Sequence, residues 1–275
     1  MCDLEVRRIA SVPDIPSIVR VFRDDPVVPW SKPDECAAWV ARRAGRGFYM
    51  TGAYCNGQMA GYCEWVATYD RGVKILYLGI MQIDCELRNR GIGTAMLADG
   101  EAYAKSIGCS RLRTMPEDER SYSFYRKFGF SQTDELFGCI CPAVKSDPPA
   151  FGRFISAIPP DTCDTHEFIF GLGQSSGRHM YEIYNHPPAT DSRTAKSARL
   201  PGGEYLQLGH WPGDKNAYVL LWSNSAVSAD TVSAILVCGG EAGFESLDFC
   251  FRSNHKLLFG GYAIEQRGTE IEKIL

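Results

Sequence analysis

The spacing of apolar positions predicts a mixed α/β order over residues 1–141. Ile15, Ile18, Val19 and Phe22 recur at intervals of three and four, which is typical of an amphipathic helix. Apolar runs bounded by glycine and polar residues predict strands. In chain order we expect a strand at Val6–Ala10, the helix around Ile15, a helix from Ser31 to Arg43, strands at Phe48–Ala53, Met59–Thr68 and Lys74–Ile83, a helix ending near Gly108, a strand at Arg111–Met115, a helix at Ser121–Phe128 and a strand at Phe130–Cys141.

Short polar segments mark where these elements begin and end. Asn56-Gly57 lies between two expected strands and favours a tight hairpin turn, because both residues tolerate a positive φ. Tyr69-Asp70-Arg71-Gly72 indicates a second turn. Ser31-Lys32-Pro33-Asp34 combines a capping residue, an early proline and an acid, as the start of a helix often does. The first half should therefore follow the order β-α-α-β-β-β-α-β-α-β.

Length and charge narrow the class of protein. The chain has 275 residues and a net charge of −4, from 29 basic and 33 acidic residues. At about 150 residues a domain, this length suggests two domains. Proteins that bind nucleic acid or membrane surfaces usually carry a basic excess, so we expect neither partner. No signal-like or membrane-spanning apolar segment is evident, and we expect a cytoplasmic protein.

The cysteines and histidines match no metal-ligand pattern. The 11 cysteines are scattered through apolar stretches without a C-x-x-C pair, and their one close pair is Cys139-x-Cys141. We therefore expect buried reduced thiols and no bound metal. All the histidines lie in the second half, so the first half should carry out any chemistry without imidazole. They are His166, His179, His186, His210 and His255.

The segment Arg88-Asn89-Arg90-Gly91-Ile92-Gly93-Thr94 follows an expected strand and opens an expected helix. The first N–H groups of a helix have no intrahelical partner and carry partial positive charge. Glycines let an anion approach that backbone closely, and Arg88 and Arg90 add positive charge. The pattern is neither G-x-x-x-x-G-K-[ST] nor G-x-G-x-x-G, so it favours a phosphate or pyrophosphate outside those two classes of nucleotide loop.

This turn resembles the acetyl-coenzyme A pyrophosphate loop, Arg/Gln-x-x-Gly-x-Gly/Ala, of the GNAT superfamily of N-acetyltransferases. Downstream, Asp118-x-x-Ser121-x-x-x-Tyr125-Arg126-Lys127-Phe128-Gly129-Phe130 is similar to that family's motif Asn-x-x-Ala-x-x-x-Tyr-x-x-x-Gly-Phe, from which Asp118 and Ser121 depart. The resemblance covers residues 6–141. It implies an α/β fold with a mixed α+β sheet, the GNAT acyl-CoA N-acyltransferase fold, in a first domain of residues 1–144.

The resemblance also implies acetyl-CoA as the acyl donor, held where the fourth and fifth strands separate. Backbone groups of Met81, Gln82 and Ile83 would pair with the pantetheine arm and the acetyl carbonyl. Residues 88–94 would hold the pyrophosphate. Fixed N–H donors that face a carbonyl also stabilise the oxyanion that develops on it.

Three positions of the second motif carry roles that the resemblance implies. Asp118 and Ser121 stand where family members contact the cofactor. Tyr125 stands where a tyrosine hydroxyl protonates the departing thiolate. A free thiol has a pKa of about 8.5 and a phenol of about 10, so this hydroxyl can act mainly as a hydrogen-bond donor. A tyrosine packed beneath its helix is the structural alternative.

A general base is needed because an amine such as that of lysine, with a pKa of about 10.4, must lose a proton before it attacks. Glu64 lies among apolar neighbours in Gly61-Tyr62-Cys63-Glu64-Trp65 and could point into the cleft, where burial would raise its pKa. Glu86, just before the glycine turn, is the second candidate. For each, a solvated or salt-bridged carboxylate at the surface is the alternative interpretation.

The second half, residues 145–275, follows a linker and repeats part of the order of the first half. The linker falls in Pro142–Phe151, around Asp147-Pro148-Pro149-Ala150. No glycine–arginine turn precedes its main helix, and Leu257 stands where Tyr125 stands in the first half. A degenerate second GNAT-like lobe and an unrelated α+β lobe both stay open. The expected elements are a start at Phe154–Ile158, strands at Ala217–Trp222, Leu247–Phe251 and Tyr262–Arg267, and helices at Ala229–Gly239 and Ser253–Phe259, with residues 171–203 unassigned.

Together these features predict an acetyl-CoA-dependent N-acetyltransferase that moves an acetyl group to a primary amine of a small molecule by direct attack in a ternary complex. A protein amine as acceptor is left open. The second lobe would shape the acceptor site or form a homodimer contact. Two alternatives are a non-catalytic acyl-CoA-binding sensor, which would lack a competent acid or base, and a transferase of a longer acyl group.

Overall fold

The computed structural model describes residues 3–275 except for residues 10–14, 24–31, 147–152, 172–175 and 188–192. In the first half the elements are β1 (Leu4–Arg8), α1 (Ile15–Val21), α2 (Pro33–Gly45), β2 (Tyr49–Cys55), β3 (Gln58–Asp70), β4 (Val73–Ile83), the 3-10 helix η1 (Cys85–Leu87), α3 (Ile92–Ser106), β5 (Arg111–Thr114), α4 (Glu119–Lys127) and β6 (Ser131–Pro142). In the second half they are β7 (Arg153–Ile155), α5 (Thr162–Thr165), β8 (Glu167–Phe170), α6 (Gly177–Asn185), β9 (Thr194–Arg199), β10 (Tyr205–His210), β11 (Asn216–Ser223), α7 (Ala229–Glu241), β12 (Ser246–Arg252), the 3-10 helix η2 (Ser253–Phe259) and β13 (Glu265–Ile274).

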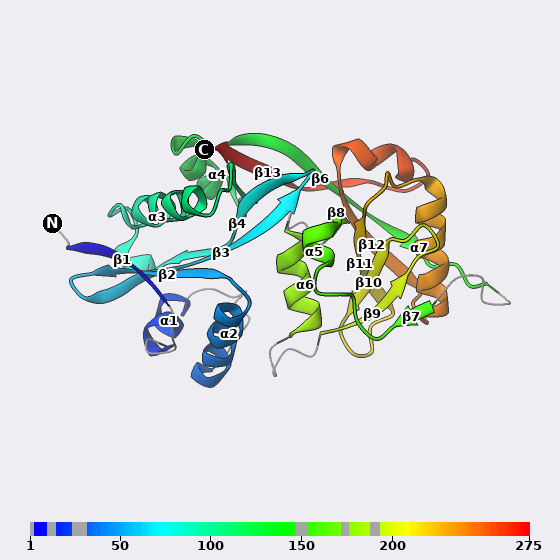
Figure 1. The fold of residues 1–275 in the computed structure, drawn as a ribbon, viewed down its shortest axis with the longest axis horizontal. Coiled ribbons are helices and arrows are strands. Elements are labelled where there is room, and N and C mark those ends of the chain that lie inside the picture. The colour runs from blue at the N-terminus through cyan, green and yellow to red at the C-terminus, as the bar shows by residue number, and fades with distance from the viewer. Residues whose placement is uncertain (1–2, 10–14, 24–31, 147–152, 172–175, 188–192) are drawn as a thin grey trace.

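The described strands form one continuous sheet that extends through both halves of the molecule (Figure 1). Its order is β1-β2-β3-β4-β5-β13-β6-β12-β11-β10-β9-β7, and β8 pairs with β11. In the first half, α1 and α2 lie on one face of the sheet and α3 and α4 on the other. The pairs β4–β5 and β11–β12 are parallel, whereas the other pairs are antiparallel, which confirms the predicted mixed α/β class. Within the described parts of the chain, no helix combines the length and apolar character that spanning a bilayer requires.

The turns of the first half lie where the sequence predicted them. Asn56 and Gly57 have φ angles of 52° and 78° in the hairpin between β2 and β3. Arg71 and Gly72 have φ angles of 50° and 73° between β3 and β4. Positive φ at two successive residues twists a hairpin as its strands require, so these four residues set the register of three strands. The predicted order of helices and strands in the first half is confirmed, with small shifts at their ends.

Some predictions fall outside the described residues, and several elements of the second half were not predicted. Ser31, the expected cap of α2, lies outside the described residues, as does the Asp147-Pro148-Pro149-Ala150 part of the linker. The helix α2 begins at Pro33, as the early proline indicated. Residues 171–203 had no assignment and contain α6 and β9, and the sequence also did not predict β8 and β10.

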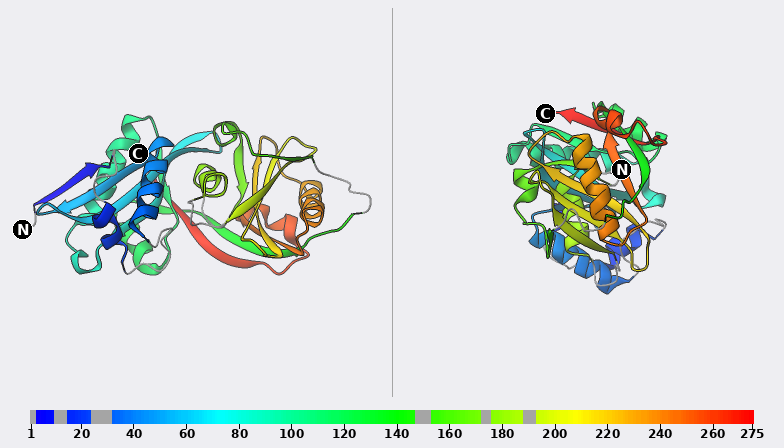
Figure 2. Two further views of the ribbon diagram at one scale, coloured as in Figure 1. Left: turned by 90° about the horizontal axis from the view of Figure 1, so that it is seen from below. Right: turned by 90° about the vertical axis from the view of Figure 1, so that its right-hand side faces the viewer.

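The last strand of the chain completes the sheet of the first half. β13 lies between β5 and β6 and pairs antiparallel with both. The sequence predicted a strand at Tyr262–Arg267, whereas β13 begins at Glu265 and runs to Ile274. In return, Leu136–Pro142 of β6 pairs with β12 of the second half (Figure 2). Each half thus holds a strand that continues from the other, and a division at residue 144 does not separate two sets of strands.

Buried charges join the strands at this exchange. Asp70, at the end of β3, accepts hydrogen bonds from Arg252 Nη1 at 2.8 Å and from Arg113 Nη1. Arg113 also donates to Glu272 at 2.9 Å, and Arg252 donates to Glu270 at 2.9 Å. One network therefore ties β3, β5, β12 and β13 together, with all five side chains buried. Buried charges are tolerated only when they are paired in this way.

The described cysteines are mostly buried thiols, with two exceptions to the expectation. In the described residues, the buried cysteines that form no disulfide are Cys36, Cys63, Cys109, Cys139, Cys141, Cys163, Cys238 and Cys250. Cys85 also forms no disulfide and is exposed. Cys55 is disulfide-bonded, so the prediction of reduced thiols was wrong for this residue. Spacing along a sequence does not show which distant thiols a fold brings together.

Asp70→Asn should lower the free energy of unfolding by about 3 kcal/mol or more, because it leaves Arg113 and Arg252 buried without their shared carboxylate. Burial raises the pKa of Asp70, but the charges of Arg252 and Arg113 outweigh this and hold the pKa below its ordinary value. The stabilisation is therefore complete above about pH 4 and is lost as the pH falls below that value. Denaturant unfolding at neutral and acidic pH measures both effects. Equal stability of parent and variant at neutral pH would contradict the network.

Candidate active site

Strands β4 and β5 run side by side for a short distance and then separate. Ile75–Tyr77 pairs with Arg111–Arg113. Where the pairing stops, the Thr114 hydroxyl donates to the Leu78 carbonyl at 3.1 Å. β5 ends there, whereas β4 continues to Ile83. In the described part of the chain, this edge of β4 beyond Leu78 therefore has no strand partner.

A β-bulge marks the point of separation. Trp65 of β3 lies opposite Leu78 and Glu64 lies opposite Ile80, so Gly79 is an extra residue on β4. Bulges bend a strand and often lie beside functional sites. The half-buried residues that follow on β4 are the three predicted to contact the pantetheine arm: Met81, Gln82 and Ile83.

The glycine turn begins just after this strand edge and leads into α3. Gly91 is the N-cap of α3 with a φ of 80°, and Asn89 also has a positive φ, of 64°. No side chain caps α3, and no acidic residue lies in its first turn. The first N–H groups of α3 can therefore be presented to an anion. The exposed members of the turn are Asn89, Arg90, Gly91 and Thr94.

The second glycine of the turn allows close packing. A Cβ on Gly93 would lie 2.9 Å from Phe124 Cζ and 3.2 Å from Ile83 Cδ1. Only glycine therefore lets the start of α3 approach both α4 and β4 this closely. Arg88 folds back against the same strand, and its Nε donates to the Ile83 carbonyl at 3.3 Å. The turn is thus fixed against the end of β4, with Ile92 buried beneath it.

Asp118 and Ser121 form a capping box at the start of α4. The Asp118 carboxylate accepts a hydrogen bond from the Ser121 N–H at 2.7 Å, and the Ser121 hydroxyl accepts one from the Asp118 N–H at 3.1 Å. The two residues that depart from the family motif therefore cap the start of α4 reciprocally. Hydrogen bonds from Ser121 hold the pKa of Asp118 below its ordinary value. Their contact with the cofactor stays a prediction.

Tyr125 is buried on α4, beside the point where β4 and β5 separate. Burial raises the pKa of Tyr125, the charges of Cys63 and Glu117 act in the same direction, and a hydrogen bond with Thr114 opposes them. The hydroxyl therefore stays protonated at neutral pH and can donate a hydrogen bond or a proton. Thr114 links this hydroxyl to the end of the β4–β5 pairing, since it also donates to the Leu78 carbonyl.

Glu64 is completely buried on the face of the sheet opposite Tyr125. Its Oε1 accepts hydrogen bonds from Trp39 Nε1 and the Tyr62 hydroxyl, both at 2.6 Å. Its Oε2 lies 3.8 Å from Arg43 Nε. The carboxylate is thus part of a buried ion pair, whereas the alternative to a catalytic role was a solvated or salt-bridged carboxylate at the surface. Its action as a base stays a prediction.

The structure also brings a histidine to this region that the sequence did not predict. Glu86, the second candidate base, is exposed and forms an ion pair with Arg23 at 2.9 Å. His179 of α6, by contrast, packs against Gly79 at the bulge of β4. An imidazole of the second half thus lies beside a strand of the first half, and the expectation that the first half works without imidazole stays a prediction. No local pattern could show this contact, because it depends on α6 lying against strands of the other half.

Strands β11 and β12 of the second half separate in a similar way, but another strand lies between them. They pair only where Asn216–Tyr218 meets Ser246–Asp248. Beyond this point β8 pairs with β11, and the Gly171 N–H donates to the Cys250 carbonyl of β12 at 3.0 Å. Phe170 of β8 is fully buried there. In the described residues, β8 thus occupies beside β11 the position that stays free beside β4.

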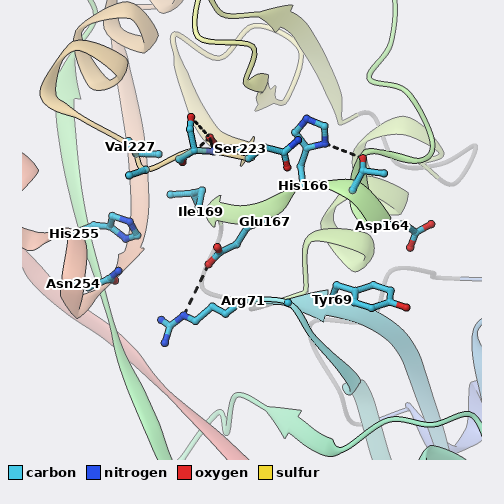
Figure 3. Close-up of a pocket in the computed structure, with 15 residues that line it drawn as sticks. Tyr69, Arg71, Asp164, His166, Glu167, Ile169, Ser223, Val227, Asn254 and His255 are labelled. Atoms are coloured by element: carbon cyan, nitrogen blue, oxygen red, sulfur yellow. Dashed lines mark hydrogen bonds and ion pairs between the residues drawn. The ribbon is translucent and has the colours of Figure 1, made fainter.

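A cavity of about 710 Å³ lies between the two halves, away from the glycine turn (Figure 3). Its lining comes from the β3–β4 turn, from α5 and β8, from the segment after β11 and from η2. Arg71 Nε and Glu167 Oε1 lie 3.9 Å apart at its wall. Arg71 precedes β4 and Ile83 ends it, so this cavity is at the wrong end of the strand to be the predicted cofactor site.

Comparison with known proteins agrees with the geometry of the first half. Residues 15–130 match the model of the Acetyltransferase (GNAT) family. An uncharacterized N-acetyltransferase of Methanocaldococcus jannaschii is 26% identical over 106 residues, which are 36% of this chain and 46% of that protein. The match therefore spans less than half of that relative. Residues 15–130 form a GNAT acetyltransferase domain, as the two motifs indicated, and this family catalyses acyl transfer.

Solved structures extend the similarity of the fold to the second half. The superposition on the crystal structure of a GCN5-related N-acetyltransferase from Kribbella flavida covers 100% of this chain and 71% of that protein's chain, with a TM-score of 0.66 at 14% identity. The superposition on a GCN5-related N-acetyltransferase from Anabaena variabilis covers 98% of this chain and 73% of that protein's chain, with a TM-score of 0.58 at 9% identity. The large mixed sheet is therefore a fold that these N-acetyltransferases share.

Gly91→Asp should weaken coenzyme A binding by about tenfold or more, because it places a carboxylate beside the expected pyrophosphate. Gly91→Asn is the matched control, since asparagine has nearly the same size and also tolerates the positive φ of this position. Titration calorimetry with coenzyme A measures both variants. Binding that is equally strong in the aspartate and asparagine variants would refute the assignment of the loop.

Proposed function

We propose that the chain is an acetyl-CoA-dependent N-acetyltransferase that acetylates a primary amine of a small molecule by direct attack in a ternary complex. The observation that carries this proposal is that three features meet at one end of β4. They are a strand edge without a partner, a helix N-terminus without a side-chain cap, and the buried, protonated Tyr125. Each feature corresponds to a different part of an acyl-CoA molecule.

The residues present fit such a donor in three places. The edge of Met81–Ile83 offers N–H and C=O groups at strand spacing, which suits the amides of a pantetheine arm. The first turn of α3, together with Arg90, suits a pyrophosphate. The donor itself would supply a thioester as the activated acyl group. Polarisation of its carbonyl by backbone N–H groups near Gly79 would stabilise the oxyanion that forms when the amine attacks.

Tyr125 would act on the leaving group. As the bond between carbon and sulfur breaks, negative charge develops on the sulfur, and the neutral phenol can donate a hydrogen bond or a proton to it. Burial keeps the hydroxyl protonated, so this donor is available over the whole neutral range of pH. The same burial excludes water, which strengthens the interaction with the developing charge.

The position of α6 supports a small acceptor. This helix lies on the side of the sheet that carries α1 and α2, where Arg46 of the first half lies 3.6 Å from Glu182 of α6. The second half therefore covers part of the face opposite Tyr125 (Figure 1). A small amine needs less space on this covered face than a polypeptide does, so we place a small molecule before a protein amine.

We also propose that the second half is a degenerate GNAT-like lobe without a cofactor site of its own. The order β11–α7–β12 repeats β4–α3–β5, and in both pairs the parallel strands separate after a short paired stretch. The insertion of β8 and the absence of glycine and arginine from Ser223–Ser228 distinguish the second half from the first. These differences support one acyl-CoA site per chain.

An assay of acetyl-CoA turnover with a broad panel of amines tests the proposed function. Release of coenzyme A thiol together with an N-acetylated product would support it. Binding of acetyl-CoA in a calorimeter with no thiol release for any amine would contradict it and would support the non-catalytic sensor. Faster turnover of longer acyl-CoA donors in the same assay would show a transferase of a larger acyl group.

Tyr125→Phe should lower kcat by about a hundredfold while leaving the affinity for acetyl-CoA nearly unchanged, because it removes the acid and keeps the ring. Tyr122→Phe, which lies on the same helix, is the matched control and should keep the parent rate. Since the pKa of Tyr125 is raised, ionisation of this residue should cause no loss of kcat up to about pH 10. Steady-state kinetics over this range measures both effects. Equal kcat in Tyr125→Phe and the parent would remove the acid role.

A further inference from the structure

Helix α6 of the second half is fixed firmly against the first half. Arg42 Nη1 donates to the carbonyls of His186 and Pro187, at 2.7 and 2.5 Å, where α6 ends. At the other end, the Ser176 hydroxyl accepts a hydrogen bond from the His179 N–H at 3.1 Å and caps the helix. Both ends of α6 are therefore held, and the position of the side chains in its first turn is set by the fold.

In this position, the imidazole of His179 lies beside the bulge of β4. A Cβ on Gly79 would lie 3.1 Å from His179 Cε1 and 3.2 Å from His179 Nδ1. The rings of Phe48 and Tyr77 flank the imidazole, with centroid distances of 6.2 and 6.3 Å. His179 is 3% exposed, and its Nδ1 has no hydrogen-bond partner in the described structure. A buried polar atom without a partner points to a ligand or a chemical role.

His179 and Tyr125 reach the separation of β4 and β5 from opposite faces of the sheet. Tyr77 and Phe48, which flank His179, belong to the core beneath α1 and α2. Tyr125 belongs to the core beneath α3 and α4. Direct transfer of an acyl group needs a base on the side of the amine and an acid on the side of the sulfur. The two side chains have this arrangement around Gly79.

We infer that His179 is the general base that takes the proton from the acceptor amine, so that the second half of the chain supplies a catalytic residue to the active site of the first. This inference rests on the proposed acetyl transfer and deepens it. It also gives a reason for glycine at position 79, since a Cβ there would lie 3.1 Å from His179 Cε1 and would press on the imidazole.

The surroundings of His179 keep its imidazole neutral. Burial lowers the pKa of His179 well below its usual range, and the charges of Arg43 and Arg193 act in the same direction. The imidazole is therefore neutral at neutral pH, which is the form that accepts a proton. Once it is protonated, Arg43 would repel it. The Glu64 carboxylate, 3.8 Å from Arg43 Nε, offsets that repulsion. In this inference Glu64 neutralises the charge of Arg43 and is not the base.

The step balances in atoms and electrons. The amine lone pair forms the new bond between nitrogen and carbon, and one proton of the amine passes to Nδ1 of His179. The bond between carbon and sulfur breaks, its electron pair goes to the sulfur, and Tyr125 supplies a proton to the thiolate. The imidazolium then loses its proton to solvent and the phenolate regains one, so no net proton is gained or lost by the protein.

His179→Gln tests the inference, because glutamine fills much of the same space but cannot take up a proton. We expect kcat with the best amine to fall by about a hundredfold at an unchanged affinity for acetyl-CoA. His186→Gln is the matched control, since His186 is also on the α6 side but its ring packs against Tyr181. The control should keep the parent kcat. A parent-like kcat in His179→Gln would overturn the inference.

Chemical rescue separates a base from a packing residue. His179→Ala leaves space beside Gly79. If a base is missing, added imidazole should raise the kcat of this variant by about tenfold or more. A folded His179→Ala variant that gains nothing from imidazole would overturn the inference.

In the parent, the ring-proton resonance that disappears in His179→Gln should shift when acetyl-CoA binds and shift less with coenzyme A, which lacks the acetyl group. A resonance that neither ligand moves would contradict contact with the reacting group. Failure of the parent to bind acetyl-CoA would instead refute the proposed function, and this inference with it.

Discussion

The early separation of β4 from β5 is the constraint on which the rest of the site depends. β5 ends at Thr114, whose hydroxyl donates a hydrogen bond to the Leu78 carbonyl of β4. The next residue of β4, Gly79, is bulged, and the strand then continues without a partner on this edge in the described structure. The glycine turn, Tyr125 and His179 are all placed relative to this point. A continued β4–β5 pairing would close the edge that an acyl-CoA would use.

The second half contributes by packing and by strand exchange. β13 enters the sheet of the first half beside β5, and the network around Asp70 ties that exchange together with buried charges. β8 lies between β11 and β12, where the first half has its free edge. Each half thus contains one pair of parallel strands that separate. In the first half the edge of β4 is available to a ligand, whereas in the second half β8 occupies the edge of β11. Two elements of the second half, α6 and β13, nevertheless contact the first half directly.

Local chemistry determined what could be predicted from the sequence. Glycine and asparagine at positive φ and the spacing of apolar residues predicted the turns and the order of elements in the first half. The motifs around Gly91 and Tyr125 indicated the two segments that we propose to bind the cofactor. The sequence could not show the place of β13, the insertion of β8 or the contact of His179 with Gly79, because each joins segments far apart in the chain. It also did not show that Cys55 is disulfide-bonded. Glu64 shows the same limit. Its burial was foreseen, but its partners Trp39 and Arg43 come from α2.

Hydrogen–deuterium exchange of the backbone amides, with and without coenzyme A, tests the central claim most directly. The account predicts that coenzyme A slows exchange at residues 81–83 and 91–94, where free N–H groups become bound, and leaves residues 223–228 before α7 unchanged. Unaltered exchange at 91–94 at saturating coenzyme A, or slower exchange at 223–228 in its place, would contradict the claim that the first half holds the acyl-CoA site.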